Sequence, residues 1–191
     1  MNILKEYFNK ISPLNDASFD EMKQHFKEVK LKKNDFFVKE GQYASTIGLL
    51  TDGVVRAFFL NKEGKEYNKQ FFTQPSIIGA YTSLITKQAN KISQQALTDC
   101  TILVADFKEI ETLYSKYHDI ERLGRKVAEF YFLEKEKKEI EMALLDADKR
   151  YLILREAFPG LESLIPQYHI ASYLGISATQ LSRIRKKLVQ A

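Results

Sequence analysis

The sequence predicts an α+β fold in which a compact β-rich domain is followed by a long helix and a small C-terminal helix-turn-helix. Between Val29 and Phe107, short runs rich in Val, Ile, Phe and Thr alternate with Gly and polar turns, a spacing typical of an all-β barrel or sandwich. Residues 108–145 contain no Pro and one Gly, and their apolar residues recur at helical spacing. After Pro166, two short apolar-periodic segments meet at Gly175, as they do in a helix-turn-helix.

Two short helices are expected before the β-rich region. Leu4, Phe8 and Ile11 are spaced to lie on one helix face, and Ser12-Pro13 ends that helix because proline cannot continue it. A second helix is expected from about Ser18 to Phe26. Strands are then expected at residues 36–38, 47–51, 54–60, 68–73, 95–97 and 102–105.

The long helix carries a repeating apolar seam. Ile120, Leu123, Val127 and Phe130 follow one another at intervals of three or four residues, which suits a helix that pairs with a copy of itself. We expect these four residues to form the dimer interface. The seam continues onto Glu134 and Lys137, so its second half is expected to be polar.

The C-terminal segment has the local signals of two helices joined by a tight turn. Asp146-Ala-Asp148 marks a helix start, and Pro159-Gly160 ends that helix. Pro166 opens the next helix, Gly175 can adopt the left-handed conformation of a tight turn, and Ser177 is a good N-cap for the last helix.

The last helix has an apolar side and a cationic side. At 3.6 residues per turn, Leu181, Ile184 and Leu188 share one side, which is expected to be buried. Thr179, Ser182, Arg183 and Lys186 lie on the opposite side, with Arg185 and Lys187 flanking it. A guanidinium fork, hydroxyl groups and ammonium groups are what base edges and phosphates require, so the face is expected to bind DNA in the major groove.

The placement of charge supports this interpretation. The chain has 191 residues and a formal net charge of +4, from 29 Lys and Arg against 25 Asp and Glu. The segment from Ser163 to Ala191 contains four Arg or Lys and no acidic residue, so the rest of the chain is balanced. An excess of positive charge at one end is typical of a phosphate-binding surface.

Composition and motifs argue against several other classes. The single cysteine, Cys100, excludes an internal disulfide and a cysteine-ligated zinc or iron–sulfur site within one chain, and is expected to be a small buried residue. His25, His118 and His169 do not have the spacing of metal ligands, so no haem or other metal site is expected. These histidines are expected to face solvent or to cap helices. Without a signal peptide or an apolar run of membrane-spanning length, we expect a cytoplasmic protein with no membrane partner. No catalytic motif was found, so an enzyme is not expected.

Fragments distributed over nearly the whole chain resemble the Crp/Fnr superfamily of bacterial transcription regulators. In the β-rich region these are Lys39-Glu-Gly-Gln42, Ile47-Gly-Leu-Leu50 and Gly53-Val-Val-Arg56. At the C-terminal end they are Ile170-Ala171, Leu174-Gly-Ile-Ser177 and Leu181-Ser-Arg-Ile-Arg185. Each fragment alone is weak, but their order and spacing are specific.

The resemblance implies an architecture and partners. A β-roll of the double-stranded β-helix or jelly-roll type would act as a cyclic-nucleotide-binding-like sensor domain over residues 1–107, followed by a dimerisation helix over 108–145 and a helix-turn-helix domain over 146–191. It implies a homodimer on pseudo-palindromic double-stranded DNA, with half-sites about 34 Å apart, and RNA polymerase as a further partner. It also implies base or phosphate contacts by Ala178, Thr179 and Arg183. The full predicted DNA-binding set is Ser177, Ala178, Thr179, Ser182, Arg183, Arg185, Lys186 and Lys187.

The effector site departs from the pattern of the cyclic-nucleotide-binding members. Where they have Phe-Gly-Glu, this chain has Ile78-Gly79-Ala80, and Asn90 and Lys91 stand where their Arg and hydroxyl residue would be. Both the carboxylate for the ribose and the bidentate cation for the phosphate are therefore missing. The candidate effector pocket comprises Gly79, Ala80, Tyr81, Thr82, Asn90 and Lys91. Control by a cyclic nucleotide is not expected, while an unknown small-molecule effector remains open.

The sequence leaves alternatives open for the effector pocket and for the function of the C-terminal helices. A polar cavity between Gly79, Asn90 and the 128–136 segment of the partner chain would indicate a small-molecule signal, whereas a plug of Phe, Tyr or Leu would indicate constitutive DNA binding. The alternative function is a ligand-sensing β-roll protein whose C-terminal helices contact another protein, for which an acidic or apolar outer face would be expected. The wing hairpin that often follows a helix-turn-helix is not expected, because only three residues follow Leu188.

Overall fold

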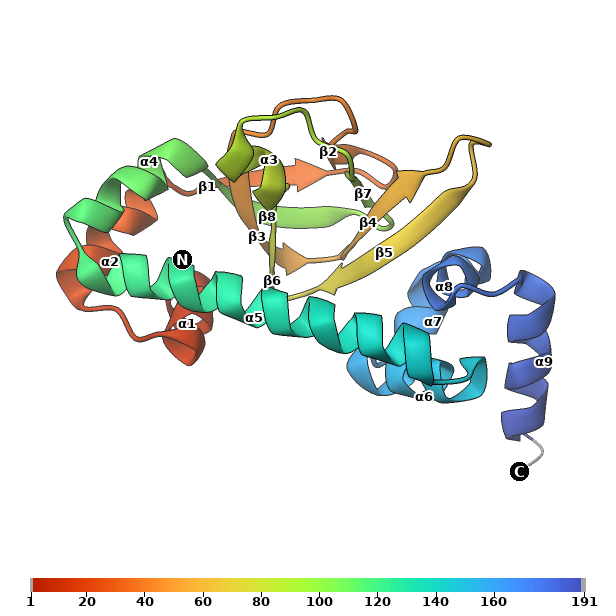
Figure 1. Cartoon of the computed structure of the whole chain (residues 1–191). Coiled ribbons are helices and arrows are strands. Elements are labelled where there is room, and N and C mark those ends of the chain that lie inside the picture. Colours follow the sequence, from red (N-terminus) through yellow and green to blue (C-terminus); the bar gives the residue numbers. More distant parts are fainter. Residues whose placement is uncertain (1, 190–191) are drawn as a thin grey trace.

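The computed structural model describes residues 2–189, and it has a β-rich domain between two groups of helices that one long helix connects (Figure 1). The strands are β1 (Lys27–Leu31), β2 (Phe36–Val38), β3 (Thr46–Asp52), β4 (Val54–Leu60), β5 (Glu66–Thr73), β6 (Ser76–Ile78), β7 (Ser93–Ala96) and β8 (Cys100–Asp106). The helices are α1 (Asn2–Ile11), α2 (Asp16–Met22), α3 (Tyr81–Thr86), α4 (Phe107–Thr112), α5 (His118–Leu144), α6 (Ala147–Ala157), α7 (Leu161–Leu164), α8 (Gln167–Leu174) and α9 (Ala178–Val189). Short 3₁₀ turns follow α2 at Lys23–His25 and α4 at Leu113–Ser115.

The strands form two four-stranded antiparallel sheets, in the orders β1-β8-β3-β6 and β2-β7-β4-β5. The residues that fill the space between them are apolar and buried. This core comprises Leu50, Val55, Ala57, Phe72, Ile78, Ala96, Cys100 and Ile102. The predicted fold class is confirmed, and Cys100 is buried in β8 as expected.

The first half of α5 is covered by the N-terminal helices. Leu4 and Phe8 of α1 share a buried cluster with Ile120 and Leu123 of α5. Beside them, the carboxylate of Asp119 accepts hydrogen bonds from the backbone and side chain of Asn15 and from the hydroxyl of Ser18 (2.8, 2.8 and 2.6 Å). These bonds give the buried charge its partners, and they fix the loop before α2 to the start of α5.

The C-terminal helices are packed on the outer face of the second sheet. Phe71 of β5 lies 5.0 Å from the ring of Tyr173 and 6.0 Å from the ring of Phe158, centroid to centroid. Val54 and Leu97 belong to the same buried cluster as Leu154, Leu161, Ile170, Leu174 and Leu181. The hydrophobic core of the helix-turn-helix therefore includes part of the β-rich domain.

Long-range packing changes the element boundaries that were expected. The helix expected over 108–145 is divided into α4, a 3₁₀ turn and α5, and the helix expected from Ser18 to Phe26 ends at Met22. Strands β1 and β6 and helix α7 were not predicted. Among residues 2–189, every helix is too short or too polar to cross a lipid bilayer.

Candidate nucleic-acid interface

The turn between α8 and α9 is closed by backbone hydrogen bonds. Gly175 has a φ of 69°, in the left-handed region that only glycine enters at low cost. This conformation lets the amide of Ile176 donate to the carbonyl of Ala171 (3.0 Å) and the amide of Gly175 donate to the carbonyl of Ser172 (3.2 Å). This pairing is the Schellman motif, so α8 ends where the sequence predicted.

The start of α9 is fixed by a reciprocal cap. The hydroxyl of Ser177 accepts from the amide of Gln180 (3.1 Å), and the Gln180 side chain accepts from the amide of Ser177 (3.2 Å). Two donors at the helix start are satisfied in this way, as in a capping box. The angle between α8 and α9 is therefore set by four local hydrogen bonds, with Ile176 packed partly buried in the corner.

The two sides of α9 differ in exposure as predicted. Leu181 and Ile184 are 1% and 7% exposed and pack against α8. The residues of the predicted DNA-binding set are all exposed: Ser177, Ala178, Thr179, Ser182, Arg183, Arg185, Lys186 and Lys187. The structure therefore places a largely polar and cationic surface outward on α9 between Ser177 and Lys187.

The four cations of this surface are not equivalent. Arg185 lies 3.6 Å from a carboxylate oxygen of Glu162, and Lys187 lies 2.6 Å from one of Asp148. Arg183 and Lys186 have no ion pair with any of residues 2–189. Nothing in the sequence around the last helix indicated these ion pairs, because both carboxylates come from helices that precede it in the chain.

Helix α8 is joined to the β-rich domain by a buried polar cluster. The guanidinium of Arg56, which is 4% exposed, donates to both carboxylate oxygens of Glu66 and to the side chain of Gln95. It also lies 3.1 Å from Nδ1 of His169. Asn68 donates to the carbonyl of His169 (3.1 Å) and lies 3.3 Å from Nδ1 of the same ring.

His169 was expected to face solvent or cap a helix, and this expectation is wrong. The side chain is buried against β4 and β5, where burial and the neighbouring charge of Arg56 lower its pKa to about 4. The neutral ring can then accept hydrogen bonds at Nδ1 from Arg56 and Asn68. No sequence signal pointed to this role, because these partners are 113 and 101 residues away.

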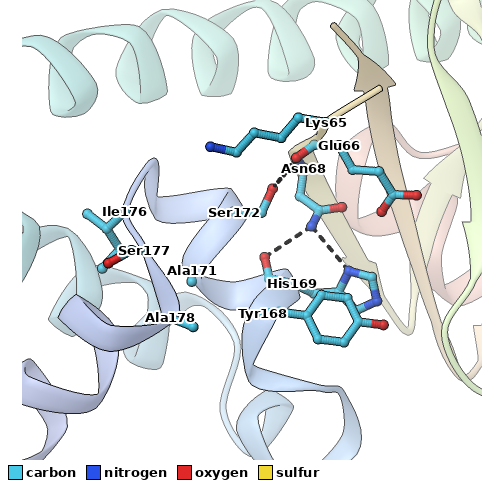
Figure 2. A pocket seen from close by; sticks show the side chains of 10 residues that line it. All are labelled: Lys65, Glu66, Asn68, Tyr168, His169, Ala171, Ser172, Ile176, Ser177 and Ala178. Atoms are coloured by element: carbon cyan, nitrogen blue, oxygen red, sulfur yellow. Dashed lines mark hydrogen bonds between the residues drawn. The ribbon is translucent and has the colours of Figure 1, made fainter. Parts of the chain in front are cut away.

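A hollow of about 410 Å³ lies between this cluster and the start of α9 (Figure 2). Its β-rich side is formed by Lys65, Glu66 and Asn68. Its other side is formed by the helix-turn-helix, from Tyr168, His169, Ala171, Ser172, Ile176, Ser177 and Ala178. The start of α9 therefore borders the β4–β5 hairpin, not only α8.

The candidate effector residues do not present a common set of polar groups. Tyr81, Thr82 and Lys91 are exposed, whereas Ala80 and Asn90 are buried. The side-chain amide of Asn90 donates to the carbonyl of Ile92, and its oxygen accepts from the amide of Ile92 (3.2 Å). Asn90 therefore closes its own loop.

Tyr131 of α5 reaches the β-rich domain at the neighbouring position. Its hydroxyl donates to the carbonyl of Ile77 (2.7 Å), and its ring lies 6.5 Å from that of Phe72. The side chain packs against the core between the sheets. An aromatic side chain of the chain's own long helix thus covers this part of the domain.

Within residues 2–189, no group of three His, Cys, Asp or Glu side chains is arranged to hold a metal ion.

The four residues expected at the dimer interface lie in different environments. Ile120 and Leu123 are 1% and 4% exposed because α1 covers them, and Val127 is partly buried against the same cluster. Phe130 is exposed. Beyond it, the exposed apolar residues Leu133, Ile140 and Leu144 continue along one side of α5, where the sequence analysis expected a polar seam through Glu134 and Lys137.

Comparisons with known proteins agree with this architecture. Residues 28–117 match the family model of the cyclic nucleotide-binding domain. A search of curated protein sequences found no match.

Solved structures of several proteins share the fold over most of the chain. FixK2 from Bradyrhizobium japonicum has a TM-score of 0.75 at 14% identity, over 86% of this chain and 85% of that one. The c-di-GMP responsive global regulator CLP of Xanthomonas campestris has a TM-score of 0.70 at 16% identity, over 92% of both chains. The catabolite activator protein of Thermus thermophilus has a TM-score of 0.58 at 18% identity, over 93% of this chain and 84% of that one.

Proposed function

We propose that this chain, whose fold is that of the Crp/Fnr transcription regulators, is a homodimeric regulator that binds a specific DNA sequence. The observation that carries the proposal is the exposed cationic face of α9, which follows a closed glycine turn and a capped helix start. Such a helix can enter the major groove, where base pairs are distinguishable.

Each residue of the face has a role that its chemistry suits. Arg183, which has no ion pair within residues 2–189, is proposed to donate to a guanine edge, and Thr179 and Ser182 to bond to bases or phosphates. Ala178 offers only a methyl group, which suits contact with a thymine methyl. Lys186 is available for a phosphate. Arg185 and Lys187 would exchange their carboxylate partners for phosphates when DNA binds.

The exposed apolar stripe of α5 is the proposed dimer interface. It consists of Phe130, Leu133, Ile140 and Leu144, with Lys137 between them. The intervals of three, four and seven residues are those of a two-stranded coiled coil. Because α1 already covers Ile120 and Leu123, we propose that pairing begins at Phe130.

We further propose that the regulator binds DNA without a cyclic nucleotide. Tyr131 covers the space next to Ile77, and the amide of Asn90 is occupied by its own loop. CLP is described as c-di-GMP responsive, so the fold does not by itself fix the effector. RNA polymerase is proposed as a further partner, and the cytoplasm as the compartment.

The test is selection of duplexes from a random pool with the purified full-length protein, followed by anisotropy titrations. We expect a pseudo-palindromic site whose binding constant falls steeply with salt, with a log–log slope of about −0.9 per phosphate contact, and is unchanged by cyclic AMP. Selection of no sequence, together with a flat salt dependence, would contradict DNA binding and favour the protein-contact alternative. A large response to cyclic AMP would contradict the proposed loss of effector control.

Arg183→Ala should cost about 1–3 kcal/mol of binding to the selected duplex and much less to an unselected one, because a bidentate base contact carries sequence information. Titrating both duplexes with wild type and variant measures this difference. Arg125→Ala, which changes an exposed arginine paired with Glu129 on α5, is the control and should bind as wild type. An equal loss on both duplexes would assign Arg183 to the phosphate backbone instead.

A further inference from the structure

The β4–β5 hairpin turn lies beside the start of the proposed DNA-reading helix. Figure 1 shows the hairpin projecting over the end of the molecule that carries α8 and α9. At its base, Lys65 borders the same hollow as Ser177 and Ala178 (Figure 2). A cation of the β-rich domain is therefore next to the end of α9 that enters the groove in helix-turn-helix proteins.

The hairpin turn is closed by hydrogen bonds. The amide of Asn61 donates to the carbonyl of Lys65, and the amide of Gly64 donates to the carbonyl of Asn61 (3.0 Å each). The side-chain oxygen of Asn61 also accepts from the amides of Glu63 and Lys65 (3.0 and 2.8 Å). Both the amide and the carbonyl of Lys65 are therefore bonded to Asn61.

The hairpin is also fixed to α8. The hydroxyl of Ser172 donates to the carbonyl of Glu66 (2.9 Å) and accepts from the amide of Asn68 (3.0 Å). These bonds join α8 to the residues directly after Lys65. Because α8 is joined to α9 by the closed turn at Gly175, hydrogen bonds connect the hairpin to α9 through α8.

The side chain of Lys65 is available for a ligand. It is exposed and has no ion pair with any residue in the range 2–189; its Nζ lies 5.5 Å from the centre of the Tyr67 ring, a contact that leaves its hydrogen-bond donors open to solvent. The neighbouring carboxylate of Glu66 is bound on both oxygens by Arg56, and Figure 2 shows it pointing away from the ammonium of Lys65. Glu63 is the acidic residue within the turn, and Lys62 beside it balances its charge.

We propose that Lys65 contacts a DNA phosphate at the edge of the groove that α9 enters, so that the β-rich domain also takes part in DNA binding. The major groove is about 12 Å wide, so a cation beside the start of a helix in the groove faces the phosphates at its border. This inference rests on the proposed function, and it adds one phosphate contact per protomer.

The experiment is an anisotropy titration of full-length Lys65→Ala on a selected and an unselected duplex of about 30 base pairs, between roughly 50 and 200 mM salt. The expected slope of log binding constant against log salt is smaller in magnitude by about 2, because the dimer loses two contacts of about 0.9 each. Affinity should fall on the order of tenfold for both duplexes alike, since a phosphate contact is independent of sequence. Lys65→Arg should restore the wild-type slope.

Lys30→Ala is the matched control, because Lys30 is an exposed lysine on β1, a strand of the other sheet, and it should leave slope and affinity unchanged. If the wild-type binding constant depends steeply on salt and Lys65→Ala has the same slope, this inference is overturned and the proposed function stands. A flat salt dependence of the wild type itself would overturn both.

Discussion

At the scale of single residues, a buried arginine is the least expected feature. Arg56 is tolerated in the interior because its guanidinium reaches acceptors on three elements, namely Glu66, Gln95 and His169. A guanidinium stays charged at any relevant pH, so these acceptors must be supplied by the fold. The cluster fixes the ring of His169 in its neutral form, and this has a measurable consequence.

The free energy of unfolding should fall as the pH is lowered from about 6.5 to about 4. The pKa of His169 is lowered to about 4 in the folded protein, so in this window the unfolded chain binds a proton that the folded chain does not. The expected loss approaches about 1.4 kcal/mol per pH unit. Urea unfolding at several pH values, compared with His169→Gln, measures it.

The free energy of unfolding of His169→Gln should change less with pH in that window than that of wild type, although the variant should be less stable at neutral pH. His118→Gln is the control, because His118 is an exposed histidine, and it should keep the wild-type slope. Parallel curves for wild type and His169→Gln would show that the pKa of His169 is not lowered by folding.

The residues of the candidate site that could be predicted from sequence are those set by local geometry. Gly175 and Ser177 act within a few residues of themselves, and the outward side of α9 follows from helical spacing alone. Arg56 and Lys65 could not be recognised in this way. Their roles depend on α8 packing against β5, which is a contact between residues about a hundred positions apart.

At the scale of elements, α5 has one face that packs against its own protomer and one that is exposed. One face contacts the protomer through Ile120, Tyr131 and Lys138, the last of which lies 3.5 Å from the centre of the Tyr173 ring. Burial lowers the pKa of Lys138 to about 8. The other face carries the exposed stripe that begins at Phe130.

Leu133→Glu should weaken the proposed dimer by about 3 kcal/mol or more, roughly a hundredfold in dissociation constant, because two apolar side chains leave the interface for each dimer. Light scattering after size exclusion should show the 22.2 kDa monomer at concentrations where wild type is a dimer. Phe132→Glu is the matched control, since Phe132 is 63% exposed against 60% for Leu133 but lies on another side of the helix. Equal dissociation of the dimer by both variants would contradict the proposal that the stripe is the dimer interface.

The sequence predicted the existence of α5 but not its outer face. Helical spacing allows more than one apolar seam, and Ile120 to Phe130 form the more regular one. Which seam is exposed depends on α1, which folds back over Leu123. The unpredicted strands β1 and β6 have a different cause, because β1 is mostly exposed and β6 has only two apolar residues, so neither has a strong apolar pattern.

At the scale of the whole molecule, the β-rich domain and the C-terminal helices share one core. Phe71 is in contact with Tyr173 and Phe158, and the Arg56 cluster lies beside them. We expect a single cooperative unfolding transition for the wild-type chain, since neither part completes its interior alone.

Arg56→Ala should separate that transition into two, with an overall loss of about 1–3 kcal/mol, because buried acceptors lose their donor. Differential scanning calorimetry reads both the number of transitions and their midpoints. Arg125→Ala removes an exposed arginine paired with Glu129 and should change stability by less than about 0.5 kcal/mol. One unaltered transition in Arg56→Ala would mean that the apolar contacts alone couple the two parts.

The aromatic contact between β5 and the last helices also limits how such a protein can be rebuilt. Replacing α6–α9 with the helix-turn-helix of another protein would leave Phe71, Val54 and Leu97 exposed to water. Exposed apolar residues of this kind promote aggregation. A chimera would therefore need complementary apolar side chains on the β-rich domain and on the new helices. Substitutions on the outer surface of α9, by contrast, leave this contact intact, because those residues are exposed and lie outside the shared core.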